Sequence, residues 1–180
     1  MQKEKDFTIK RNIMLIGFMG AGKTTVGKKL SYKLRVPVED TDKLIEQKAG
    51  KTISEIFAAE GEEAFRQMET EELKELSKRK YHRIYSVGGG TPVREENRDL
   101  LKKCGTVIYL RLKPETVWER VKEDTTRPLL QCEDPLGRIR ELMGARKEAY
   151  ESCADVILDV DELDAEEIAK RLALWLEENA

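Results

Sequence analysis

The apolar residues of the chain fall into five short runs, separated by longer segments rich in Lys, Glu and Leu. The runs occupy Ile13–Ile16, Val36–Val38, Ile84–Val87, Val107–Leu110 and Val156–Leu158. Short β-branched or apolar runs are typical of buried strands, whereas the charged segments between them have the length of helices. Because strands that alternate with helices form parallel sheets, the pattern predicts an α/β fold with a parallel sheet.

Capping residues identify the starts of two helices. Asp164 followed by Glu167 and Thr52 followed by Glu55 both have the spacing of an N-terminal cap pair. The apolar residues that recur at helical spacing after the first pair are Ile168, Leu172 and Trp175. We therefore expect a last helix that packs one face on the sheet and a short helix that begins near Thr52.

One segment interrupts the alternation. Lys122 to Asp134 is polar, contains Pro128 and shows little apolar periodicity. It is predicted to be a mobile loop, and two interpretations stay open: an ordinary surface connection or a functional loop.

Length and charge restrict the class of protein. A chain of 180 residues is long enough for one domain with its own core, so residues 1–180 are predicted to form a single domain. The net charge of −2 gives no global electrostatic case for binding nucleic acid. No run of eighteen apolar residues and no signal-peptide pattern occurs, so we expect a cytoplasmic protein without a membrane partner.

The cysteines do not form a metal-binding pattern. Cys104, Cys132 and Cys153 are widely spaced, and His82 is the only histidine. We interpret the three cysteines as reduced thiols and expect no zinc site.

A glycine-rich motif provides the strongest chemical signal. The run Gly17–Thr25 contains G-x-x-x-x-G-K-[ST], follows the first apolar run and opens a helical segment. Its glycines allow backbone N–H groups to surround a phosphate, Lys23 supplies a charge between the β- and γ-phosphates, and Thr24 offers a hydroxyl ligand to Mg²⁺. The predicted nucleotide contacts in this loop are Gly20, Ala21, Gly22, Lys23, Thr24 and Thr25.

Two other classes of P-loop protein fit poorly. The asparagines Asn12, Asn97 and Asn179 do not form the Asn-Lys-x-Asp element with which GTPase switches bind guanine. Large ATPase motors need a strand that ends in an acidic residue, whereas the third apolar run leads into Gly88–Gly90. A small-molecule kinase remains.

Two carboxylates follow the second apolar run. Asp40 and Asp42 lie at its C-terminal end, where ligands of open α/β sheets bind. Asp40 could hold Mg²⁺ with Thr24, and Asp42 could orient or deprotonate an attacking hydroxyl. Alternatively, either aspartate caps the helix that continues through Leu44 and Ile45.

The motif set resembles the shikimate kinases from Ile13 to about Asp159. The matching motifs, in order, are G-F-M-G-A-G-K-T-T-V-G, D-T-D, F-R-x-x-E, G-G-G, R-P-L-L and R-x-x-x-Y. The resemblance implies a three-layer P-loop kinase fold with a five-stranded parallel sheet in order 2-3-1-4-5, flanking helices and a mobile lid at about residues 121–134. It also implies a substrate-binding helical region at about residues 42–80.

The implied activity is transfer of the γ-phosphate of ATP to the 3-hydroxyl of shikimate, with Mg²⁺ as cofactor. By the same resemblance Asp42 binds the substrate hydroxyl, Arg66 and Arg146 bind its carboxylate, and Gly88, Gly89 and Gly90 line the pocket. Taken alone, Arg66 could instead pair with Glu62 or Glu69 on its helix, and Arg146 with neighbouring acids. Arg127 matches the lid arginine and Arg120 the residue that stacks on adenine, with Leu158–Asp161 near the other side of the base. Lys23, Asp42 and Arg127 are the expected catalytic residues.

Some features depart from the family pattern. Glu39 stands where the family more often has an apolar or aromatic residue, which adds a third acid beside Asp40. Trp118 and Trp175 are interpreted as packing residues.

The rival functions are a related kinase of another metabolite, such as gluconate or a nucleoside monophosphate, and a non-catalytic ATP-binding regulatory module. The expected molecule is a monomer whose partners are ATP and shikimate.

Overall fold

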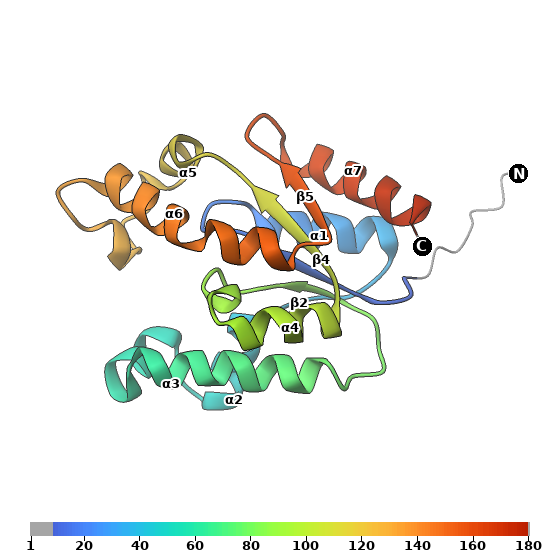
Figure 1. Ribbon diagram of the computed structural model, residues 1–180, viewed down its shortest axis with the longest axis horizontal. Coiled ribbons are helices and arrows are strands. Elements are labelled where there is room, and N and C mark those ends of the chain that lie inside the picture. The colour runs from blue at the N-terminus through green and yellow to red at the C-terminus, as the bar shows by residue number, and fades with distance from the viewer. Residues whose placement is uncertain (1–8, 180) are drawn as a thin grey trace, which may run out of the picture.

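Five strands form one parallel sheet in the order β2-β3-β1-β4-β5 (Figure 1). The computed structural model describes residues 9–179, so residues 1–8 and 180 of the predicted single domain lie outside the described part. The strands are β1 (Asn12–Ile16), β2 (Val38–Asp40), β3 (Ile84–Ser86), β4 (Gly105–Arg111) and β5 (Val156–Asp159). This order confirms the α/β class and the topology that the resemblance implied.

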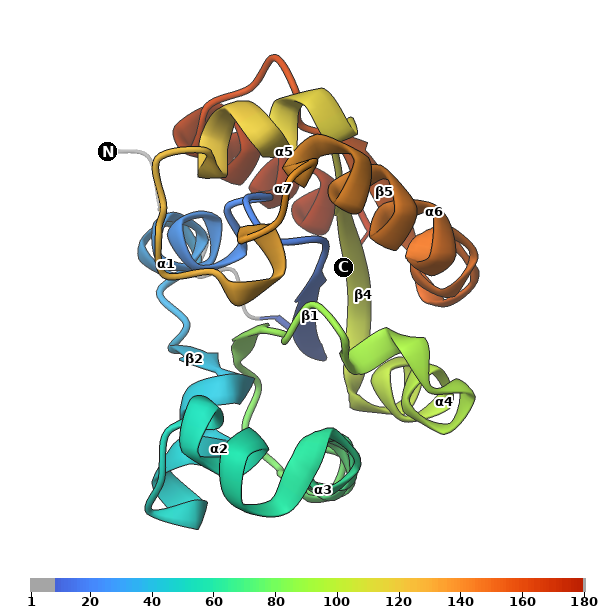
Figure 2. The ribbon, with the colours of Figure 1, turned by 90° about the vertical axis from the view of Figure 1, so that its left-hand side faces the viewer.

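Helices cover both faces of the sheet, which gives the expected three layers. The helices are α1 (Lys23–Leu34), α2 (Thr41–Ala49), α3 (Ile53–Leu76), α4 (Glu95–Cys104), α5 (Pro114–Val121), α6 (Pro135–Cys153) and α7 (Ala165–Glu178). Helices α1 and α7 pack on each other on one side, and α4 and α6 contact each other on the opposite side (Figure 1). Helices α2 and α3 lie together at one end of the molecule (Figure 2). Among residues 9–179, no helix combines the length and the apolar character that crossing a membrane requires.

The central strand explains why the apolar runs are continuous rather than alternating. All five residues of β1 are buried, because helices cover both faces of the sheet. Met14, Leu15 and Ile16 are 0% exposed and belong to the main core. Trp118 and Trp175 are partly buried against that core, as expected for packing residues.

The predicted bounds of the second strand are wrong by two residues. The apolar run suggested Val36–Val38, whereas β2 begins at Val38 and ends at Asp40. Pro37 lacks an N–H to donate to a neighbouring strand, and only its carbonyl is used, as the acceptor for Ile84 N at 2.9 Å. The shift places the pairing of β2 with β3 directly at Asp40, which lies opposite Ser86.

The capping predictions are confirmed. The Thr52 hydroxyl accepts from Glu55 N while the Glu55 carboxylate accepts from Thr52 N, which forms a reciprocal capping box. The Asp164 carboxylate accepts from Glu167 N at 2.8 Å. The first helical segment after Thr52 is short, because a φ of 85° at Gly61 breaks the helical backbone. Beyond this break α3 continues to Leu76.

The segment predicted as a lid connects α5 to α6. It consists of turns and one 3-10 turn, η2 (Pro128–Leu130), which follows Arg127. Asp134 ends the segment by capping α6 through Gly137 N at 2.9 Å. Its mobility stays a prediction.

Candidate active site

The phosphate-binding loop lies between β1 and the start of α1. A Cβ on Gly17 would lie 2.8 Å from Leu110 O, so the loop passes too close to β4 for a side chain there. Gly20 and Gly22 have φ values of 76° and 84°, which glycine adopts without steric cost. The predicted motif therefore forms a tight turn that leads into the N-terminus of α1.

Lys23 lies inside this loop. Its ammonium donates to Gly17 O at 2.7 Å and to Phe18 O at 3.1 Å. Burial lowers the pKa of Lys23 to about 8, although the carboxylates of Asp42 and Asp40 oppose the shift. An anion next to this ammonium would stabilise its charged form.

Three oxygen groups meet between the loop and the ends of β2 and β3. Thr24 Oγ1 lies 3.3 Å from Asp40 Oδ2 and 3.3 Å from Ser86 Oγ. The other oxygen of Asp40, Oδ1, caps α2 by accepting from Asp42 N at 2.9 Å. The capping alternative is therefore correct for one oxygen of Asp40, while the second remains free to face Thr24. Hydroxyl and carboxylate oxygens are the ligands that Mg²⁺ prefers, so the donor set fits this ion.

Asp42 lies where the phosphate-binding loop faces the Gly88–Gly90 side of the pocket. Its Oδ1 is buried and, among residues 9–179, has no hydrogen-bond partner. Burial, followed by the charges of Asp40 and Glu69, raises the pKa of Asp42 to about 6. A Cβ on Gly88 would lie only 2.6 Å from Asp42 Oδ1, so glycine is needed where the wall of the pocket meets this carboxylate.

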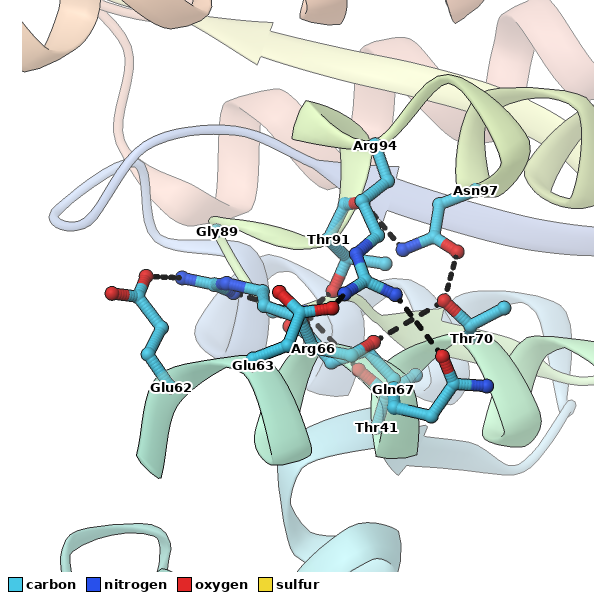
Figure 3. A network of polar contacts seen from close by, with 12 residues as sticks. Thr41, Glu62, Glu63, Arg66, Gln67, Thr70, Gly89, Thr91, Arg94 and Asn97 are labelled. Atoms are coloured by element: carbon cyan, nitrogen blue, oxygen red, sulfur yellow. Dashed lines mark hydrogen bonds and ion pairs between the residues drawn. The ribbon is translucent and has the colours of Figure 1, made fainter. Parts of the chain in front are cut away.

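Arg66 projects from α3 and is fixed by two acids (Figure 3). Its guanidinium donates to Glu69 at 2.8 Å and to Glu62 at 3.3 Å, so the ion pairs considered from the sequence are both present. A Cβ on Gly90 would approach Arg66 Cζ to 2.6 Å. The guanidinium thus lies directly against the glycine wall, the side of the pocket formed by Gly88, Gly89 and Gly90, and its acidic partners lie on α3.

Arg146 reaches the same wall from α6. Its Cζ lies 5.6 Å from the ring centroid of Phe18, and the structure gives it no carboxylate partner within residues 9–179. Tyr150, one helical turn further on, donates to Gly89 O at 2.5 Å, and its hydroxyl also bonds the guanidinium of Arg146. Arg146 therefore has more capacity to bind an added anion than Arg66 has.

The two arginines of the lid side have different surroundings. Arg127 Nε donates to Asp124 Oδ2 at 2.9 Å, and the positive charge of Arg127 helps to lower the pKa of Lys23. Arg120 donates to Gly20 O and to Val160 O, both at 3.0 Å. Arg120 therefore connects the phosphate-binding loop with the segment after β5.

One cavity of about 510 Å³ brings these groups together. The predicted residues that line it are Gly20, Gly22, Lys23, Thr24, Thr25, Asp40, Asp42, Arg66, Gly88, Gly89, Gly90, Arg127 and Arg146. Ala21 and Arg120 are absent from the lining: Ala21 is fully buried, and Arg120 lies behind Gly20. Thus two segments far apart in the sequence, the loop after β1 and helix α6, contribute to one site.

Sequence reasoning missed several groups of the site. Glu69 and Tyr150 belong to the F-R-x-x-E and R-x-x-x-Y motifs, in which only the arginines had been given a role. Ser86 could have been found from its place at the end of β3, opposite Asp40. Phe57 and Leu129 also line the cavity although each is more than a third exposed; Leu129 belongs to the R-P-L-L motif, in which only the arginine had been given a role, and Phe57 belongs to no motif.

Glu39, the departure from the family pattern, points away from Asp40. Its carboxylate pairs with Arg79 at 2.9 Å and with Arg83 at 3.6 Å. Neighbouring residues of a strand face opposite sides, so the third acid does not join the cluster around Thr24.

Comparison with known proteins identifies the family. The family model described as shikimate kinase matches residues 19–177. The chain belongs to the shikimate kinase family. Shikimate kinases from Cupriavidus pinatubonensis and Legionella pneumophila are 42% and 43% identical to it over 92% of its length, covering 86% and 94% of those chains.

Solved structures agree with this membership. The shikimate kinase from Acinetobacter baumannii, in complex with shikimate, matches with a TM-score of 0.86 and 39% identity and covers 94% of each chain. A gluconokinase from Sinorhizobium meliloti reaches a TM-score of 0.61 at 16% identity over 97% of this chain and 95% of its own. That second likeness shows the fold alone.

Proposed function

We propose that this chain is an ATP-dependent shikimate kinase, which converts ATP and shikimate into ADP and shikimate 3-phosphate. The observation that carries the proposal is the shared cavity, in which the phosphate-binding loop faces Asp42, Arg66 and Arg146. Membership of the family and the likeness to a relative in complex with shikimate support the choice of acceptor.

The nucleotide half of the cavity, formed by the phosphate-binding loop with Asp40 and Ser86, binds and orients the triphosphate. Backbone N–H groups of the loop and the N-terminus of α1 surround the β-phosphate, and Lys23 turns its ammonium from the loop carbonyls toward the γ-phosphate. Thr24, Asp40 and Ser86 would hold Mg²⁺. Held there, the ion would supply positive charge to offset the negative charge of the phosphate oxygens.

The acceptor half of the cavity, formed by Asp42, Arg66, Arg146 and the glycine wall, binds a carboxylated alcohol. Arg66 and Arg146 each offer a planar guanidinium that can donate two parallel hydrogen bonds to a carboxylate. A neutral sugar would offer no negative charge to either guanidinium, which gives selectivity for an acid.

Asp42 aligns the nucleophile. With a pKa of about 6, its carboxylate is mostly ionised at neutral pH and accepts a hydrogen bond from the 3-hydroxyl. As the new P–O bond forms and the bond to the β-phosphate oxygen breaks, the hydroxyl proton passes to Asp42. Arg127, on the lid segment, adds positive charge beside the transferred phosphoryl group. Arg120, between Gly20 and Val160, borders the place of the adenine.

A direct test follows ADP release with a small panel of acceptors: shikimate, gluconate and nucleoside monophosphates. Magnesium-dependent turnover with shikimate, together with a product phosphorylated at the 3-oxygen by NMR, is expected. Faster turnover with gluconate would select the related-kinase alternative, and tight ATP binding without turnover on any acceptor would select the regulatory module.

Three expectations from the sequence accompany this proposal. We place the protein in the cytoplasm, as a monomer, without nucleic acid as a partner, in keeping with its net charge of −2. Sedimentation of the purified protein with and without both substrates would test the monomeric state.

A further inference from the structure

A chain of buried polar groups connects α4 with the acceptor half of the cavity (Figure 3). Its members are Thr70 on α3, Thr91 in the 3-10 turn η1 (Thr91–Val93), and Asn97 on α4. They are 0%, 2% and 0% exposed, respectively, and none of them lines the cavity. Buried polar groups are costly unless they are hydrogen-bonded, so their partners show what the chain holds in place.

Asn97 joins two elements at the centre of this chain. Its Nδ2 donates to Thr91 O at 2.9 Å, and its Oδ1 accepts from Thr70 Oγ1 at 2.7 Å. The main-chain carbonyl of Thr91 can only accept, which fixes the orientation of the amide. Asn97 therefore ties η1 to α3 by two bonds that a side chain without an amide cannot reproduce.

Thr91 continues the connection to the site. Its hydroxyl donates to Glu69 Oε1 at 2.7 Å, while Arg66 Nη1 donates to Glu69 Oε2 at 2.8 Å. Glu69 is 2% exposed, and each of its oxygens has one of these two donors. The Glu69 carboxylate is thus held from one side by Thr91 and holds Arg66 on the other.

The same turn sets the glycine wall. Thr91 N donates to Gly88 O at 3.1 Å, and Gly88 N donates to the hydroxyl of Thr41 at 3.1 Å. Because Arg66 lies directly against Gly90, a shift of η1 changes both the wall and the space for the guanidinium.

We propose that Thr91 and Asn97 are positioning residues for the acceptor. They fix the Glu69 carboxylate and the glycine wall, and thereby hold the Arg66 guanidinium where it can grip the acceptor's carboxylate. Among residues 9–179, the side chains of Thr70, Thr91 and Asn97 make no hydrogen bond to the phosphate-binding loop, so their influence is expected on the acceptor. This inference rests on the proposed function and extends it to residues that never touch the substrate.

The first test is Thr91→Val, which keeps the shape of the side chain and removes the hydroxyl. The Michaelis constant for shikimate should rise about tenfold, because one oxygen of Glu69 loses its donor, while that for ATP stays within about twofold. Thr91→Ser restores the hydroxyl and should recover most of the loss. Ile168→Val, in the core between α7 and the sheet, is the matched control: it should lower the melting temperature without separating the two constants.

A double-mutant cycle decides whether Thr91 acts through Arg66. In an Arg66→Lys background, Thr91→Val should add less than about twofold to the Michaelis constant for shikimate, because the guanidinium that it positions is already gone. Additive effects, or equal changes in the constants for both substrates, would overturn the proposal.

A second variant and a structure keep the inference independent of one substitution. Asn97→Asp places a carboxylate oxygen against Thr91 O, and it should reproduce the selective loss for shikimate. A crystal structure of Thr91→Val without substrates should show the Arg66–Glu69 contact broken or displaced from 2.8 Å. An unchanged contact overturns the positioning role, whereas absence of shikimate turnover in the unmodified protein overturns only the proposed function.

Discussion

The two halves of the cavity are held in shape by different kinds of contact. The nucleotide half depends on the main chain: glycines at positive φ, the first turn of α1, and carbonyls that accept from Lys23. The acceptor half depends on side chains, with Arg66 held by Glu69 and Glu69 held by Thr91. Main-chain geometry is shared by any sequence that makes the turn, whereas a side-chain arrangement exists only if each partner is present.

This difference shows where specificity resides. The triphosphate is the same whatever molecule accepts the phosphoryl group, so a backbone loop can bind it with no contact to the acceptor. Recognition of one acceptor requires donors placed for a carboxylate and a hydroxyl, and therefore a supporting layer of buried polar groups. Changes in the acceptor half should leave nucleotide binding intact, which the following substitutions test.

The largest expected effect is on turnover in Asp42→Asn. Loss of the acceptor for the hydroxyl proton should reduce kcat by about 10³-fold, in the range of general-base contributions. The dissociation constant for ATP, measured by calorimetry, should change by less than about threefold. Turnover like that of the unmodified protein would remove Asp42 from its role.

The next effect concerns the glycine wall. Gly90 has an ordinary φ of −88°, so Gly90→Ala is tolerated by the backbone and acts only through the 2.6 Å approach of its Cβ to Arg66 Cζ. Displacement of the guanidinium should lower kcat/KM for shikimate by about 10²-fold. Gly144→Ala in α6 is the matched control, because a Cβ there meets nothing within 4 Å. It should change kcat/KM for neither shikimate nor ATP.

A smaller effect is expected for Arg66→Lys. The ammonium retains the charge but loses the two parallel donors, so the Michaelis constant for shikimate should rise about tenfold. Steady-state kinetics with each substrate varied in turn measure the split. If the constant for ATP rose equally, the division of the cavity into two independent halves would be wrong.

The smallest effect is on stability. The pKa of Asp42 is raised from 3.8 to about 6, so the folded state disfavours the ionised carboxylate, and stability is lost as the pH rises through this interval. Asn at this position carries no charge. At pH 7 to 8, Asp42→Asn should therefore melt at a temperature several degrees above that of the unmodified protein, and this gain should vanish below pH 4. Calorimetric melting curves over that range test the sign.

Most of the fold was predictable because it follows from local rules. Continuous apolar runs marked the strands, and the caps at Thr52 and Asp164 marked two helix starts. The bounds of β2 were wrong because the periodicity of Val36–Val38 ignored the register with β3, which is a tertiary property. The break at Gly61 inside α3 also escaped, since a single glycine in a helical pattern does not reveal its φ.

The site was predictable where a motif carries the chemistry. The phosphate-binding motif predicted Lys23 and Thr24, the end of the second apolar run predicted Asp42, and the family resemblance implied Arg66. The structure brings all four into one cavity, while their roles stay predictions. Thr91 and Asn97 could not be found, since a buried hydroxyl or amide has no signature until its partners are known. Whether Asp40 served as cap or metal ligand was likewise undecidable, because its two oxygens face different groups.

Arg120 ties Gly20 to Val160, two carbonyls that are 140 positions apart in the chain. The phosphate-binding loop is therefore fixed in part by Arg120 of α5 and by the carbonyl of Val160 after β5, both far from it in the sequence. A nascent or truncated chain that stops before β5 lacks the Val160 carbonyl to which Arg120 donates. Contacts of such long sequence separation form late in folding, so the capacity to hold a nucleotide should appear all at once, with the completed sheet.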